Sequence, residues 1–180
     1  MNLPNRITLA RILAIPAYCA MMALERPHWT AGAGVLFILL ALTDCLDGYV
    51  ARSRGLVTDL GKFLDPLADK VLALSAASLF VADQRISAFA LILILAREMS
   101  ILSLRTMAAL NNRVLAADIY GKAKTASQLV ALSAMHFEGI LSSPWLARGA
   151  DAVFWFSLAM TVFSGCNYIA KNYDVIQPKS

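Results

Sequence analysis

Residues 44–69 read DCLDGYVARSRGLVTDLGKFLDPLAD, a stretch that places four aspartates at the inner edges of two strongly apolar segments. Apolar sequence runs from Val35 to Leu42 before the first pair of these aspartates and from Val71 to Val81 after the last. On insertion scales, a charge at the centre of a membrane helix costs roughly 2.5–3.5 kcal/mol, and less near the helix ends. Four acids placed together therefore need a compensating cation, and a pair of divalent metal ions is the simplest candidate.

The acids in this stretch and one small residue beside each pair are spaced as on one face of a helix. The spacing is i, i+3 and i+7 in the first segment and i, i+4 and i+8 in the second. The positions that share a stripe are Asp44, Asp47 and Ala51 in the first segment and Gly61, Asp65 and Asp69 in the second. Because only residues 53–60 connect the segments, we expect two antiparallel helices whose acidic stripes face each other. Carboxylate oxygens are hard ligands that suit Mg²⁺ or Mn²⁺ better than zinc.

The composition predicts a membrane protein. The chain has 180 residues, of which 59% are hydrophobic, and its mean hydropathy is +0.63, which is not typical of a soluble domain. Six apolar runs approach the roughly 20 residues that cross a bilayer. These runs are residues 8–24, 31–51, 61–82, 86–109, 120–140 and 150–171. With no internal repeat and no long linker, the sequence predicts one all-α integral membrane domain, residues 1–180, with six transmembrane helices.

The basic residues predict the orientation of these spans. If six spans put both termini on one side, only Arg26, Arg85 and Arg148 of the 16 Lys and Arg residues fall on the opposite face. Cytoplasmic loops carry the excess of Lys and Arg in membrane proteins. We therefore expect the termini and the acidic stretch, and with it the active site, on the cytoplasmic side.

The fourth span is almost entirely apolar except for Arg97, Glu98 and Arg105, and an arginine at that depth needs a partner. Two interpretations are open for the basic residues of this part of the chain. They can set topology and reach to lipid phosphate, or they can form a phosphate pocket. We favour the pocket, because topology explains the depth of Arg97 poorly. The residues concerned are Arg97, Arg105, Lys122 and Lys124.

The start of the fifth span separates its two lysines. Lys122 and Lys124 are two positions apart, so they cannot both point the same way on a helix. Lys124 instead shares a stripe with Gln128, four positions later.

The pattern D-x2-D-G-x2-A-R-x8-G-x3-D-x3-D resembles the signature of the CDP-alcohol phosphotransferase family. It is complete here, as Asp44, Asp47, Gly48, Ala51, Arg52, Gly61, Asp65 and Asp69. Two further segments resemble the bacterial phosphatidylglycerophosphate synthases of that family. One is Pro-Asn-x-Ile-Thr-x-x-Arg, from Pro4 to Arg11, and the other extends from Ala96 to Thr125.

The resemblance implies a multi-pass enzyme of the bacterial inner (cytoplasmic) membrane that works in phospholipid biosynthesis. It would transfer the phosphatidyl group of CDP-diacylglycerol to sn-glycerol 3-phosphate, giving phosphatidylglycerophosphate and CMP. Two divalent ions, Mg²⁺ or Mn²⁺, and a general base, Asp69, are implied with it. The implied metal ligands are Asp44, Asp47, Asp65 and Asp69. The implied nucleotide contacts are Asn5, Thr8, Arg11, Gly48, Ala51, Arg52 and Gly61. Arg97, Arg105, Lys122 and Lys124 would hold the acceptor phosphate.

The same resemblance implies a homodimer in contact with membrane lipids, and no nucleic-acid partner is expected. Two other functions stay open at this point. A related family member could use inositol phosphate, serine or phosphatidylglycerol as the acceptor. A proton- or ion-coupled transporter could line its pathway with the same carboxylates, and it would show ion flux without nucleotide turnover.

Overall fold

The computed structural model describes the backbone of residues 3–53, 59–111, 113, 115, 116 and 118–176. Side chains are described within these ranges except at residues 3–6, 44–53, 59–67, 69, 174 and 176. The described parts of the chain are helical and contain no strand, which confirms the all-α prediction. The helices are α1 (Leu3–Met22), α2 (Pro27–Ser53), α3 (Asp59–Ala82), α4 (Ala88–Leu110), α5 (Ile119–Met135), α6 (Glu138–Leu141), α7 (Pro144–Lys171) and α8 (Tyr173–Ile176).

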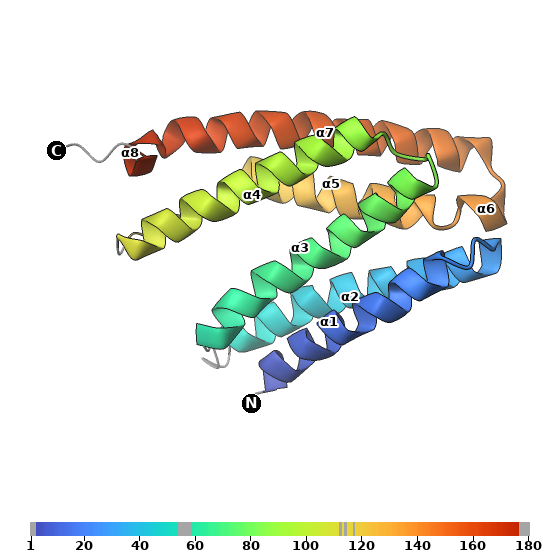
Figure 1. Cartoon of the computed structure of the whole chain (residues 1–180), viewed down its shortest axis with the longest axis horizontal. Helices are drawn as coiled ribbons and strands as arrows, with labels where there is room; N and C mark the ends of the chain where they lie inside the picture. The colour runs from blue at the N-terminus through green and yellow to red at the C-terminus, as the bar shows by residue number, and fades with distance from the viewer. Residues whose placement is uncertain (1–2, 54–58, 112, 114, 117, 177–180) are drawn as a thin grey trace.

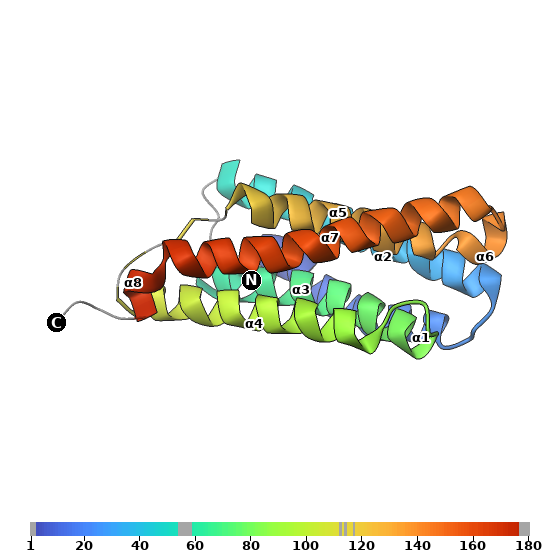
Figure 2. The same cartoon turned by 90° about the horizontal axis from the view of Figure 1, so that it is seen from above.

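The long helices form a single bundle in which α1, α2 and α3 make one group and α4, α5 and α7 another (Figures 1 and 2). Helix α1 packs against α2 and α3, while α5 lies along α7 and α4 also packs on α7. Helix α3 joins the two groups through contacts with both α4 and α5. Consecutive long helices run in opposite directions, so α2 ends and α3 begins at the same end of the bundle (Figure 1).

Local sequence explains where several helices begin and end. The Ser87 side chain accepts a hydrogen bond from the backbone N–H of Ala90 and so caps the start of α4. Asp118 caps α5 in a similar way, by accepting from the N–H of Ile119 at 2.8 Å. Helix α7 begins at Pro144, six residues before the apolar run expected from the sequence, because proline fits the first position of a helix.

The fifth apolar run, expected as one span over residues 120–140, is instead two helices, α5 and the short α6. The break falls at His136, which is fully buried against the ring of Phe37 at a centroid distance of 5.3 Å. His136 is 2.6 Å from the carbonyl oxygen of Leu132 through Nδ1 and 2.9 Å from the hydroxyl of Tyr18 through Nε2. A polar ring tied to two other elements is a tertiary contact, so the apolar pattern alone did not predict this break.

A cluster of ion pairs closes the end of the bundle opposite the α2–α3 connection. Arg85, between α3 and α4, donates to both carboxylate oxygens of Glu138 at 2.8 Å and to Asp151 of α7 at 2.6 Å. These contacts, first of all the hydrogen bond with Glu138, raise the pKa of the Arg85 guanidinium above its usual value. We call Arg85, Glu138 and Asp151 the Arg85 clasp, and it fixes the start of α7 to the α3–α4 turn.

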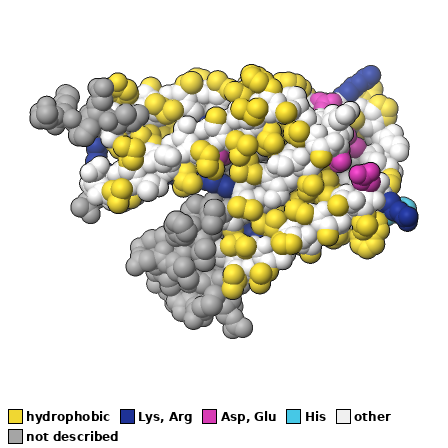
Figure 3. All heavy atoms as spheres, in the orientation of Figure 1, with side chains coloured by type: hydrophobic (Ala, Val, Ile, Leu, Met, Phe, Trp, Pro, Cys, Tyr) yellow, Lys and Arg dark blue, Asp and Glu magenta, His cyan; other side chains and the backbone are white. Residues whose placement is uncertain are grey.

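The described surface is strongly apolar. Large hydrophobic side chains are exposed on every long helix, among them Leu13, Val35, Phe89, Val130 and Trp155. Figure 3 shows hydrophobic side chains over most of the described part of one face, with acidic side chains near the end that carries the Arg85 clasp. A soluble monomer rarely exposes so much contiguous apolar surface.

Within the described residues, α7 is the one helix both long and apolar enough to cross a membrane by itself. Three shorter apolar helical segments qualify by composition but not by length. They are Ile7–Met22, Pro27–Thr43 and Lys70–Ala82. Helix α4 has the necessary length but carries Arg97, Glu98 and Arg105, whose side chains are bonded inside the bundle as described below.

Candidate functional site

The two halves of the acidic pattern lie on two helices that pack against each other. Asp44, Asp47, Gly48, Ala51 and Arg52 belong to the last part of α2, and Gly61, Asp65 and Asp69 to the first part of α3. Because α2 and α3 run in opposite directions, both halves lie at one end of the bundle (Figure 1). The predicted metal ligands, the predicted base Asp69 and the nucleotide contacts of this pattern have side chains outside the described residues, as does Asn5.

The start of α1 lies at the same end of the bundle as the start of α3 (Figures 1 and 2). Two predicted nucleotide contacts, Thr8 and Arg11, are described there and are almost completely buried, with exposed fractions of 0% and 1%. They are three positions apart and therefore share one face of α1. An arginine is rarely buried to this extent unless it is paired.

The side chains that the structure describes include no group of three or more His, Cys, Asp or Glu that could bind a metal ion, and the side chains of the four aspartates of the pattern lie outside them. The chemistry of the donor set itself fits a divalent ion. Carboxylates from the ends of two adjacent helices supply the oxygen ligands that Mg²⁺ and Mn²⁺ prefer.

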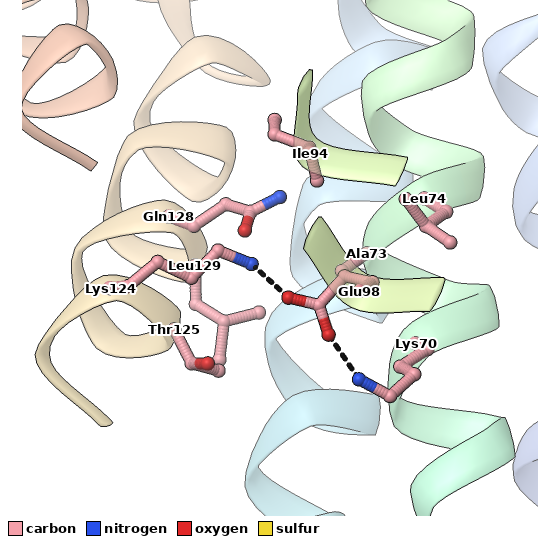
Figure 4. A pocket seen from close by; sticks show the side chains of 9 residues that line it. All are labelled: Lys70, Ala73, Leu74, Ile94, Glu98, Lys124, Thr125, Gln128 and Leu129. Carbon is pink, nitrogen blue, oxygen red and sulfur yellow. Dashed lines mark hydrogen bonds and ion pairs between the residues drawn. The ribbon is translucent and has the colours of Figure 1, made fainter. Parts of the chain in front are cut away.

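The described part of the site is a buried cluster of charges centred on Glu98 of α4 (Figure 4). Oε1 of Glu98 accepts hydrogen bonds from Nζ of Lys124 and from Nη1 of Arg97, each at 2.8 Å. Oε2 accepts from Nζ of Lys70. We call Lys70, Arg97, Glu98 and Lys124 the Glu98 cluster; it connects α3, α4 and α5.

Three cations meet one carboxylate in this cluster, which leaves an excess of two positive charges. Buried charges are costly unless they are paired. A small pocket opens beside the cluster, and Gln128 and Thr125 of α5 line it together with Glu98 and the two lysines (Figure 4). A pocket with excess positive charge and neutral hydrogen-bonding groups is suited to an anion, and a phosphate carries about two negative charges at pH 7.

Arg97 is held in a narrow slot between α5 and α7. Its Nη2 donates to the Ser164 hydroxyl at 3.2 Å, while Nη1 reaches Glu98. The walls of the slot are glycines: a Cβ at Gly165 would lie 3.0 Å from Cγ of Arg97, and one at Gly121 would lie 3.0 Å from Nη2. A side chain at either glycine would therefore crowd Arg97 in this position.

The other two basic residues predicted for the phosphate pocket lie apart from the Glu98 cluster. Nε of Arg105 donates to the hydroxyl of Tyr168 at 3.2 Å, and its guanidinium lies 5.7 Å from the centre of that ring. Lys122 is exposed, whereas Lys124 is buried next to Gln128. The structure therefore brings Arg97 and Lys124 together, and it places Arg105 and Lys122 elsewhere.

Comparison with known proteins identifies the family of the chain. Residues 1–163 match the family described as CDP-alcohol phosphatidyltransferase. The chain belongs to this family. It is therefore an enzyme of the transferase class, as the acidic pattern predicted.

Several relatives within the CDP-alcohol phosphatidyltransferase family match the chain over nearly its whole length. A CDP-diacylglycerol–glycerol-3-phosphate 3-phosphatidyltransferase of Bacillus subtilis is 39% identical, and the match covers 98% of this chain and 97% of the relative. A protein of the same name from Rickettsia bellii is 34% identical, with 93% of each chain covered. A probable phosphatidylglycerophosphate synthase of Mycobacterium tuberculosis is 34% identical over 94% of this chain and 81% of its own.

For this CDP-alcohol phosphatidyltransferase, sequence reasoning did not assign a site role to Glu98 or Lys70. Lys70 pairs with Glu98 across two helices. The signal for Glu98 was present, because it is the one acid in an apolar run that otherwise carries only Arg97 and Arg105. Its partners come from three helices, and that convergence appears only in the folded chain.

Proposed function

We propose that the chain transfers the phosphatidyl group of CDP-diacylglycerol to sn-glycerol 3-phosphate, giving phosphatidylglycerophosphate and CMP. The observation that carries this proposal is the Glu98 cluster, whose excess positive charge suits an acceptor that itself bears a phosphate. The names of the relatives support it, since those proteins match the chain over nearly their full length.

In this proposal, Asp44, Asp47, Asp65 and Asp69 hold two divalent ions, Mg²⁺ or Mn²⁺. When bound, such ions neutralise the charge of a pyrophosphate and of the departing CMP. The nucleotide lies along the motif residues of α2 and α3 and against the start of α1. The residues assigned to it are Asn5, Thr8, Arg11, Gly48, Ala51, Arg52 and Gly61.

Asp69 is the proposed general base, because it is the motif acid next to Lys70, which belongs to the Glu98 cluster. It takes the proton of the acceptor hydroxyl while the hydroxyl oxygen forms a bond to the β-phosphorus of the donor. The bond between that phosphorus and the CMP oxygen breaks, and CMP leaves with the bonding electrons. Arg97 and Lys124 hold the acceptor phosphate, while Arg105 and Lys122 attract the anion toward the site.

We further propose that α1 to α5 and α7 span the cytoplasmic membrane of a bacterium as six helices, with the active site and termini on the cytoplasmic side. The exposed hydrophobic side chains on all long helices support this arrangement. So does the distribution of the 16 basic residues, because only Arg26, Arg85 and Arg148 belong to the opposite end. A homodimer surrounded by lipid is proposed on family likeness.

The test uses the full-length protein in lipid vesicles and measures CMP release from CDP-diacylglycerol. Glycerol 3-phosphate, inositol phosphate, serine and phosphatidylglycerol are supplied separately as acceptors. We expect release only with glycerol 3-phosphate, and release stimulated by a different acceptor would refute the proposed acceptor. Ion flux with no CMP release for any acceptor would favour a transporter instead.

The variant Asp69→Asn tests the proposed base. We expect it to bind CDP-diacylglycerol in the presence of metal but to release no CMP, because the amide cannot accept the hydroxyl proton. Asp83→Asn, at an exposed position at the other end of the bundle, is the matched control and should turn over normally. Near-normal turnover by Asp69→Asn would show that another group is the base.

A further inference from the structure

The Glu98 carboxylate lies between the helix that carries the proposed base and the helix that carries the proposed acceptor site. Oε2 is bonded to Lys70 of α3, which follows Asp69 directly in the chain. Oε1 is bonded to Lys124 of α5 and to Arg97 of α4. One carboxylate thus ties three helices together at the level of the site (Figure 4).

We propose that Glu98 is a positioning residue that fixes the spacing between Asp69 and the cations that bind the acceptor phosphate. This inference rests on the proposed function of the site. Glu98 acts through its neighbours. Its ion pair with Lys70 fixes the position of α3, and its hydrogen bonds with Lys124 and Arg97 fix the two side chains that bind the acceptor. Its own atoms do not take part in the reaction.

The hydrogen-bonding capacity of the cluster allows this role. A lysine ammonium has three N–H donors, and an ionised carboxylate has about four acceptor sites. Lys124 uses one donor on Glu98, so it can hold Glu98 and an anion at the same time. The acceptor phosphate therefore adds to the cluster and does not have to displace Glu98.

Burial makes the position of Glu98 well defined. The residue is only 6% exposed, and Lys124 is 3% exposed. The second terminal nitrogen of the Arg97 guanidinium donates to Ser164 of α7, so the cluster is also tied to α7. An interaction network with fixed geometry of this kind can set distances between reacting groups, and small errors in such distances lower rates strongly.

The role predicts a specific kinetic pattern for Glu98→Gln in the full-length protein in vesicles. The acceptor KM should rise by about tenfold or more, since hydrogen bonds to charged groups are the strong ones. The kcat should fall as well, because Lys70 no longer holds α3. The KM for CDP-diacylglycerol should stay within about twofold of the wild-type value.

A double-mutant cycle with Lys70→Met tests the link to α3. If Lys70 acts through Glu98, the double variant should have a kcat close to that of Glu98→Gln alone, because contacting residues are not additive. Multiplication of the two single effects on kcat would overturn the proposal. So would an equal rise of both KM values in Glu98→Gln, or no kinetic change at all.

Glu138→Gln is the matched control, because it makes the same substitution in an ion pair between other elements, the Arg85 clasp. It should keep wild-type values of both KM and kcat, and a rise in acceptor KM equal to that of Glu98→Gln would overturn the proposal. If Glu98→Gln does not fold, Glu98→Asp carries the test, since it keeps the charge but shortens the side chain. We then expect a folded protein with raised acceptor KM, and normal kinetics in that variant would overturn the proposal.

Failure of the proposed function would appear in the wild-type protein and not in the variants. The wild-type protein itself would then release no CMP with glycerol 3-phosphate. Active wild type with unchanged Glu98 variants would overturn only the positioning role.

Discussion

Adding one methyl group to Gly165 of α7 tests whether the position of Arg97 matters for acceptor binding. A Cβ there would lie 3.0 Å from Cγ and 3.9 Å from Cβ of Arg97. Nonbonded carbon atoms pack best at about 3.5–4.0 Å. The Arg97 side chain must therefore move by a few tenths of an ångström to accommodate the methyl group.

This displacement changes the position of the Arg97 guanidinium. The bond from Nη2 to the Ser164 hydroxyl is already 3.2 Å long, so a shift away from α7 weakens it further. A hydrogen bond from the Arg97 guanidinium to the proposed acceptor phosphate would contribute about 1.5–3 kcal/mol, so misalignment that removes it costs about tenfold to a hundredfold in binding. We therefore expect Gly165→Ala to raise the acceptor KM by about tenfold or more.

The stability of Gly165→Ala should change only modestly. Overpacking costs about 1–3 kcal/mol, whereas replacing glycine by alanine inside a helix gains about 1 kcal/mol. The net loss is then about 0–2 kcal/mol. Thermal unfolding in detergent or lipid, measured with the same preparation, separates this loss from the effect on acceptor binding.

Gly149→Ala is the matched control for this experiment. Gly149 also lies in α7, and a Cβ there would meet no atom within 4 Å. It should keep its acceptor KM and gain slightly in stability, because only the helix propensity changes. If Gly165→Ala has the same acceptor KM as Gly149→Ala, the reasoning that places Arg97 in the acceptor site is refuted.

Three further predictions follow from the same geometry. Lys124→Met should raise the acceptor KM by about tenfold, while Lys122→Met, which removes an exposed charge, should raise it by no more than about threefold; equal effects in saturation curves would argue against the buried pocket. Arg85→Met should lower the free energy of unfolding by roughly 1–3 kcal/mol without changing either KM, because its hydrogen bonds lie at the far end of the bundle; an altered KM would contradict this separation. A metal chelator should abolish CMP release, with recovery on addition of Mg²⁺ or Mn²⁺, and activity that survives complete chelation would refute the proposed metal ligands.

Much of the architecture could be predicted from the sequence, because apolar runs of nearly constant length determine where the long helices lie. The second, third and fourth runs correspond closely to α2, α3 and α4. Helical periodicity also predicted the contrast between the buried pair Lys124 and Gln128 and the exposed Lys122. These are local properties of a helix, and they do not depend on which neighbour covers each face.

The features that sequence reasoning missed arise from contacts between distant segments. The break after Met135 depends on Tyr18 and Phe37 around the His136 ring, and no local pattern encodes it. The bond between Arg105 and Tyr168, more than sixty residues apart in the chain, could not be predicted either, and a role of Arg105 toward the acceptor stays a prediction. Glu98 was assigned no role from the sequence, because its interactions are with cations contributed by α3 and α5.

The Glu98 cluster also has a consequence for the biogenesis of the protein. A polypeptide emerges from the ribosome in chain order, so in the proposed membrane arrangement α3 enters the bilayer before α4, and α5 arrives last of the three. Lys70 is therefore present to neutralise Glu98 when α4 inserts, and Lys124 is added one helix later. A nascent chain halted before α5 would hold Glu98 with Lys70 and Arg97 but without Lys124, and so without the lysine that completes the proposed acceptor site.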